Sequence, residues 1–248
     1  MESKLDTQRQ YRRIGGICAI AWVALQIIGD ALHPRLPVDS VDMMHCISTS
    51  PVWMVAHLIL LFDYLVLIPM TVSFAMSFGE GHWANTLTTP LVVIAVTLGI
   101  VQVCIHPTVL TIISDNYMQS NGADHMNHQG VPKDFLLIVF KAFWIYNIVM
   151  EFIHLLILNI VIFLFAIQMR SSMIFKRWLA TFGVIGSIVA IITLVIGEVV
   201  LKRSKMGDLL IFGVGMIPLA LWLVVTAIAL LRYRGELPVT ETKSGTHA

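Results

Sequence analysis

The sequence predicts an all-α, polytopic transmembrane bundle of six helices. Hydrophobic residues make up 57% of the 248 residues, and charged residues only 12%, against roughly 25% charged residues in soluble domains. Apolar runs long enough to cross a hydrocarbon core about 30 Å thick recur along the chain. The 16 basic and 15 acidic side chains nearly balance, so the basic surface typical of a nucleic-acid-binding protein is not expected.

The first predicted span covers residues 14–32 and follows a basic N-terminal tail. A basic tail before an apolar run is also typical of a signal peptide, but that class ends in a cleavage site of small residues. This run instead ends in Ile27-Ile28-Gly29-Asp30. We therefore expect a retained transmembrane helix.

The second, third and fourth predicted spans cover residues 52–78, 87–113 and 135–169. The fourth is too long for a simple span, because its residues at about 1.5 Å each exceed a hydrocarbon core of about 30 Å. We expect the aromatic segment before Tyr146 to leave the bilayer, either as an extension of the helix or as a short helix on the surface.

The fifth and sixth predicted spans cover residues 178–201 and 209–231. Small residues such as Gly183 and Gly186 recur in the fifth span, a pattern that allows helices to approach closely in lipid. We expect one six-helix domain over residues 1–234, followed by a flexible cytoplasmic tail at 235–248.

The distribution of basic residues predicts the orientation of the bundle. Ten Lys and Arg side chains flank the spans on the side of the two termini, against six on the opposite side. Because cytoplasmic loops carry the excess of Lys and Arg, both termini are expected to be cytoplasmic. The residues that end the first span and begin the second would then lie in the outer leaflet.

Ionisable side chains inside apolar spans are costly in a bilayer, so each is a candidate for function. Counting along the helices places six of them in one layer of the outer leaflet and one, Asp63, near the bilayer centre. They are Asp30, His57, Asp63, His106, Glu151, His154 and Glu198.

Four of these residues predict a metal or haem site: His57, His106, Glu151 and His154. The spacing Glu-x-x-His puts both side chains on one helix face, as in di-metal carboxylate proteins. Only one such motif is present, which favours a single Fe, Zn or Cu ion, or haem, over a di-iron centre. Asp30 and Glu198 form a secondary polar layer in this interpretation. The protein would carry out redox or hydrolytic chemistry on a lipophilic substrate.

Two other functions fit the same residues. A carboxylate near the bilayer centre is typical of proton relays, so Asp63 is the proton-relay candidate of a small proton-coupled carrier. Alternatively, the protein is a non-catalytic accessory or sensory subunit that binds other membrane subunits. Its polar side chains would then form hydrogen bonds between helices. The segments Met43-Met44-His45-Cys46 and 125–128 also offer soft and imidazole ligands suited to copper.

The first 80 residues contain Arg-Arg-Ile-Gly-Gly at the start of the first span, Gly29, Asp30, His33 and Pro34 at its end, and Trp53 and His57 in the second. With these residues the chain resembles a broad group of small, uncharacterised bacterial six-helix membrane proteins. It implies six helices and a location in the bacterial inner (cytoplasmic) membrane, and it implies no activity.

Overall fold

A computed structural model describes residues 2–77, 83–120, 130–172, 174–201 and 204–233. Six of its helices are long and apolar enough to cross a membrane, which agrees with the six spans expected from the sequence. The chain therefore has the architecture of a multi-pass membrane protein. The predicted tail at 235–248 lies outside the described residues.

The first three spans are α1 (Glu2–Leu32), α3 (Trp53–Ser77) and α4 (Trp83–Met118), with the short helix α2 (Ser40–Thr49) between the first two. The later spans are α5 (Lys133–Met169), then α6 (Arg177–Val195) continuing into the π-helical segment η1 (Ile196–Val200). The last is a continuous run of α7 (Lys205–Asp208), η2 (Leu209–Met216) and α8 (Ile217–Arg232).

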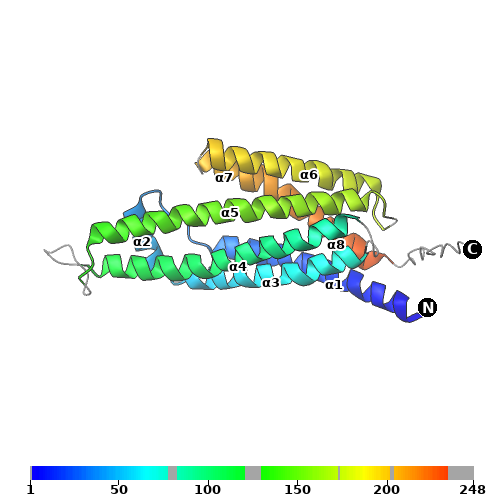
Figure 1. Cartoon of the computed structure of the whole chain (residues 1–248), viewed down its shortest axis with the longest axis horizontal. Coiled ribbons are helices and arrows are strands. Elements are labelled where there is room, and N and C mark those ends of the chain that lie inside the picture. Colours follow the sequence, from blue (N-terminus) through cyan, green and yellow to red (C-terminus); the bar gives the residue numbers. More distant parts are fainter. Residues whose placement is uncertain (1, 78–82, 121–129, 173, 202–203, 234–248) are drawn as a thin grey trace, which may run out of the picture.

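The helices close into a ring. Along the chain α1 packs against α3, α3 against α4, α4 against α5 and α5 against α6, while α8 packs against both α6 and α1. The start of α1 and the end of α8 therefore lie at the same end of the bundle (Figure 1). We call the opposite end the distal end. Which side of the membrane it faces remains a prediction.

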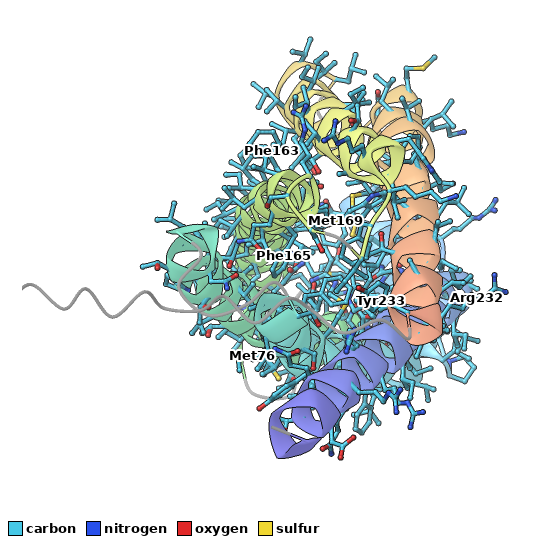
Figure 2. All side chains as sticks on the ribbon, turned by 90° about the vertical axis from the view of Figure 1, so that its right-hand side faces the viewer. Met76, Phe163, Phe165, Met169, Arg232 and Tyr233 are labelled. Atoms are coloured by element: carbon cyan, nitrogen blue, oxygen red, sulfur yellow. The ribbon has the colours of Figure 1, made fainter. Side chains whose placement is uncertain are left out.

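The half of the bundle nearest the termini has a mainly apolar interior, in which Thr88 and Gln168 are also buried. Phe165 and Met169 lie inside the ring and Arg232 at its periphery when the bundle is viewed from this end (Figure 2). Trp222 ties the last span to α6, because its indole nitrogen donates a hydrogen bond to the Leu179 carbonyl at 2.9 Å. The buried polar groups that matter for function lie further from the termini.

At the distal end α4 and α5 run past the other helices (Figure 1). They contain 36 and 37 residues, or about 54–55 Å at 1.5 Å per residue. The aromatic segment before Tyr146 is therefore an extension of the helix. This is the first of the two alternatives that the sequence left open.

Helix α2 packs against the projecting ends of α4 and α5. Met43 and Met44 are 5% and 0% exposed and belong to an apolar cluster with Leu110 and Phe140. These methionines, considered above as copper ligands, pack against apolar side chains in that cluster. The other proposed copper segment, 125–128, lies outside the described residues.

Candidate metal centre

Three histidines from different parts of the chain meet at the distal end. His33 follows α1, His57 lies near the start of α3 and His106 lies in α4. Each offers one ring nitrogen, and the three nitrogens lie within 4.8 Å of one another. Within the described part of the chain, no other set of three His, Cys, Asp or Glu side chains meets this criterion.

The local sequence brings these residues together. Helix α1 ends at Leu32, and the proline at position 34 favours the extended backbone that turns the chain away. Gly29 lets α1 approach α3 closely, since a Cβ atom there would lie 2.7 Å from Cδ2 of Leu60. His33 therefore lies beside His57, with ring centroids 5.0 Å apart.

Hydrogen bonds orient two of the rings. Nδ1 of His57 lies 2.7 Å from the carbonyl oxygen of Trp53, and Nδ1 of His33 lies 3.0 Å from that of Pro34. A carbonyl only accepts, so each Nδ1 must donate the hydrogen, which leaves the lone pair on Nε2. Metal-binding histidines are held in this way, with the other ring nitrogen donating to a carbonyl or carboxylate.

His106 differs from the other two histidines in its hydrogen bonding. It is 8% exposed, and its Nδ1 is buried without a hydrogen-bond partner. Leaving such a group unpaired costs about 1–3 kcal/mol. Its ring centroid lies 5.1 Å from that of His57, so a metal ion held by the neighbouring rings could engage this side chain as well.

Two tryptophans enclose the histidines. The Trp53 ring lies 4.2 Å from that of His57 and 5.2 Å from that of His106, and Trp144 lies 5.7 Å from His106. Burial lowers the pKa of His33 below its usual value, although the Pro34 carbonyl and Asp30 act in the opposite direction. His33 is therefore neutral near pH 7, the form that binds metal.

The site fits a single transition-metal ion better than haem. Imidazoles suit zinc, copper and iron, and a tetrahedral ion with bonds of about 2.0–2.1 Å holds its ligand nitrogens about 3.3 Å apart. The three rings would have to approach one another on binding. Haem does not fit between His57 and His106, because their ring centroids lie 5.1 Å apart, closer than two imidazoles on opposite faces of one porphyrin.

His154 and Glu151, the other two residues of the sequence-based site, do not belong to this group. His154 is 4% exposed, and its Nε2 lies 2.9 Å from the hydroxyl of Tyr64. On α5 it is Trp144 that contacts His106, and His154 lies ten residues further along, about 15 Å. The sequence-based depth count began α4 at Thr88, whereas the helix begins five residues earlier.

The remaining acidic candidates occupy three different environments. Asp30 is exposed and accepts a hydrogen bond from Gln26 at 3.0 Å. Glu198 is partly buried in η1. Asp63 is only 1% exposed, and its Oδ1 atom has no hydrogen-bond partner. Of the three, only Asp63 has the burial expected of a proton-relay residue.

Sequence reasoning did not include His33 in the metal site. A signal was present, because Gln26, Asp30 and His33 are spaced by four and three residues and so share one face of the first helix. What the sequence does not show is that this face meets His57.

Comparison with known proteins gives no relative: no family model, curated protein or solved structure matches the chain.

Proposed function

We propose that the protein is an integral membrane metal protein whose ion is held by His33, His57 and His106. The observation that carries this proposal is the geometry of the three rings. Their ligand nitrogens lie within 4.8 Å of one another, and two of the rings have Nδ1 fixed by a backbone carbonyl. This set keeps two residues of the sequence-based site and replaces Glu151 and His154 with His33.

The three imidazoles would hold the ion and leave it able to bind a further ligand. A zinc ion there would supply Lewis-acid chemistry for hydrolysis. Copper or iron would supply redox chemistry instead. The protein's part is to orient the rings through the two carbonyls and to surround them with Trp53 and Trp144.

The position of the site favours an amphiphilic or lipophilic substrate. It lies where α1 ends and α3 begins, and tryptophans are enriched where helices meet the membrane–water interface. A molecule dissolved in the bilayer could reach the open metal position with its polar end, while its apolar part stays in lipid.

Metal analysis tests the proposal directly. The protein is purified in detergent without a nickel column, and its bound metal is measured by mass spectrometry for wild type, His57→Ala and His106→Ala. We expect close to one ion per chain in the wild type and loss of most of it in both variants. The matched control is His45→Ala, because His45 is exposed on α2 and should not affect metal content.

The same measurement separates the two candidate ligand sets. His154→Ala should keep its metal if the three-histidine site is correct. Metal loss in His154→Ala together with full retention in His57→Ala would refute the site and favour a centre on α5. Folding of every variant is checked by size-exclusion chromatography and thermal unfolding.

A proton-coupled carrier is the second candidate, and the burial of Asp63 favours it. In proteoliposomes, Asp63→Asn should abolish proton-driven flux while leaving the metal content unchanged if the protein is a carrier. Unchanged flux and metal content in all of these variants, accompanied by lower stability, would indicate an accessory subunit whose polar side chains serve packing alone.

A further inference from the structure

Helices α3 and α4 meet at two levels, both of which carry polar side chains. Seven residues separate His57 from Tyr64 on α3 and Gly99 from His106 on α4, or about 10 Å along each helix. At the upper level the rings of His57 and His106 lie 5.1 Å apart. At the lower level the Tyr64 ring lies directly on Gly99, where any Cβ atom would overlap with it. Gln102, one turn from His106, lies between the levels.

Helix α5 joins the same two levels. Trp144 contacts His106 at the upper level, and His154 contacts the Tyr64 hydroxyl at the lower level. Asn147 follows Trp144 by three residues and precedes His154 by seven, so it shares their face of the helix. Asn147 therefore lies between the levels on α5, as Gln102 does on α4.

The two amides between the levels have unpaired oxygens. Gln102 and Asn147 are 9% and 7% exposed, and Oε1 of the first and Oδ1 of the second are buried without a hydrogen-bond partner. Oδ1 of Asp63, next to Tyr64 in the chain, also lacks a partner, although the Asp63 carboxyl interacts with the Trp22 indole of α1. Leaving such oxygens unpaired in the interior is unfavourable. Buried waters are the usual donors to groups of this kind, so the three oxygens on α3, α4 and α5 indicate bound water in this part of the bundle.

The lower level contains the groups that can exchange a proton. Tyr64 donates to or accepts from His154 at 2.9 Å, and the carboxyl groups of Asp63, Glu151 and Asp30 lie within electrostatic range of Tyr64. A phenol that is hydrogen-bonded to an imidazole can pass a proton between that ring and a water molecule. Tyr64 and His154 therefore form the hydrogen-bonded pair of the lower level.

Below this level apolar side chains fill most of the interior, in which Asn159 is also buried. Leu67, Leu158 and Phe165 are buried in the main hydrophobic cluster. The cavity among these side chains measures about 20 Å³ and has an apolar lining. Apolar cavities of this kind stay dry. A water chain that enters from the distal end therefore stops at Asp63.

We propose that Gln102 and Asn147 line a water-filled half-channel that leads from the three-histidine site to a proton-binding site made by Asp63, Tyr64 and His154. A proton arrives on water as hydronium and transfers to a carboxylate oxygen of Asp63, leaving neutral water. No electron moves in this step. The half-channel opens toward the distal end only, and it does not require that a metal ion be bound above it.

Infrared spectroscopy of the protein in lipid tests this access. The carboxylic acid band of Asp63, recorded across a pH titration, is identified as the band that Asp63→Asn removes. On transfer to D2O the wild-type band should shift within the mixing time, and Gln102→Leu and Asn147→Leu should slow the shift by about tenfold or more. The matched control is Thr71→Val, since Thr71 is also buried, on α3, but its hydroxyl donates to the Leu67 carbonyl; its exchange should match the wild type.

Exchange that is slow in the wild type, or that neither leucine variant changes, would overturn the proposal. If the variants do not fold, a structure of the wild type at a resolution that shows ordered water decides the question. Density within hydrogen-bonding distance of the Gln102 and Asn147 side-chain oxygens supports the half-channel, and a dry interior there overturns it. His57→Ala, which should lose metal, should keep the wild-type exchange rate, so the two proposals fail separately.

Discussion

His57 and His154 are buried to the same extent, each 4% exposed, yet the structure gives them different chemistry. Nδ1 of His57 donates a hydrogen bond to a carbonyl of its own helix, which leaves the lone pair on Nε2. Nε2 of His154 is hydrogen-bonded to the hydroxyl of Tyr64. Burial and residue type alone therefore do not single out a candidate metal ligand. The hydrogen-bond partner of each ring nitrogen must be known as well.

The two levels differ in the same way. The upper level brings together three imidazoles, from the residue after α1, from α3 and from α4, whose ligand nitrogens lie within 4.8 Å of one another, whereas the lower level pairs one imidazole with one phenol. We expect the upper level to bind a metal ion and the lower level to handle protons. The predictions below are ordered by the size of the expected effect on one level or the other.

Acid should remove all of the bound metal from the three histidines of the upper level. Protons compete with metal for imidazole nitrogens, and burial lowers the pKa of His33 below the usual value of about 6.5. His33 therefore stays neutral to lower pH than a free histidine. We expect metal to be retained near pH 6 and lost on further acidification, as measured by metal content after dialysis at each pH. Return to about pH 7 with added metal should restore binding; retention at the lowest pH would contradict a site built from histidines.

Trp53→Ala should be the most damaging single substitution at the upper level. Trp53 is 1% exposed and contacts all three histidine rings. Truncation of a buried tryptophan costs about 3–5 kcal/mol, so thermal unfolding in detergent should shift strongly downward and metal content should fall. Trp178→Ala is the control, because Trp178 is 59% exposed; a similar loss of stability there would remove the special role of Trp53.

Gly99→Ala should disturb the lower level alone. The added methyl group overlaps with the Tyr64 ring, and overpacking of this kind costs about 1–3 kcal/mol. Thermal stability should fall while metal content stays at the wild-type value. Gly213→Ala provides a milder comparison, since its Cβ would lie 3.2 Å from Cδ1 of Leu209. Metal loss in Gly99→Ala would show that the levels are not independent.

Tyr64→Phe should have the smallest effect. It removes one hydrogen bond to His154, and hydrogen bonds between membrane helices contribute about 0.6 kcal/mol on average. A double-mutant cycle with His154→Ala, measured by unfolding in detergent, should return a coupling of about that size. A coupling near zero would mean that the pair does not form, and the lower level would then lose its proton-exchanging role.

The six spans could be predicted from the sequence because each depends on local composition. The long apolar run before Met169 also predicted that part of α5 extends beyond the bilayer, since the run is longer than a hydrocarbon core of about 30 Å. The proposed three-histidine site was anticipated only in part. His57 and His106 were singled out because they are ionisable residues in apolar runs, whereas His33 follows a helix end and was not among the residues singled out.

The missing information is the register between helices. Whether His106 faces Trp144 or Glu151 depends on how far α4 and α5 are shifted along each other, and a difference of five residues in the start of α4 moves that level by about 7.5 Å. Close contacts such as the Tyr64 ring on Gly99 help fix this register. They join residues far apart in the chain, so one sequence alone does not reveal them.

The contact between the first and last helices also has a consequence for biosynthesis. Gly16 of α1 lies against Leu231 and Ala227 of α8, so closely that a Cβ atom would come within 2.7 Å of Leu231. Membrane proteins are made from the N-terminus onward, so α1 enters the bilayer long before its partner exists. Until α8 is inserted, that glycine face is open to lipid or to a chaperone. Chains truncated before residue 217 therefore lack the partner for this face, which quality-control proteases could recognise.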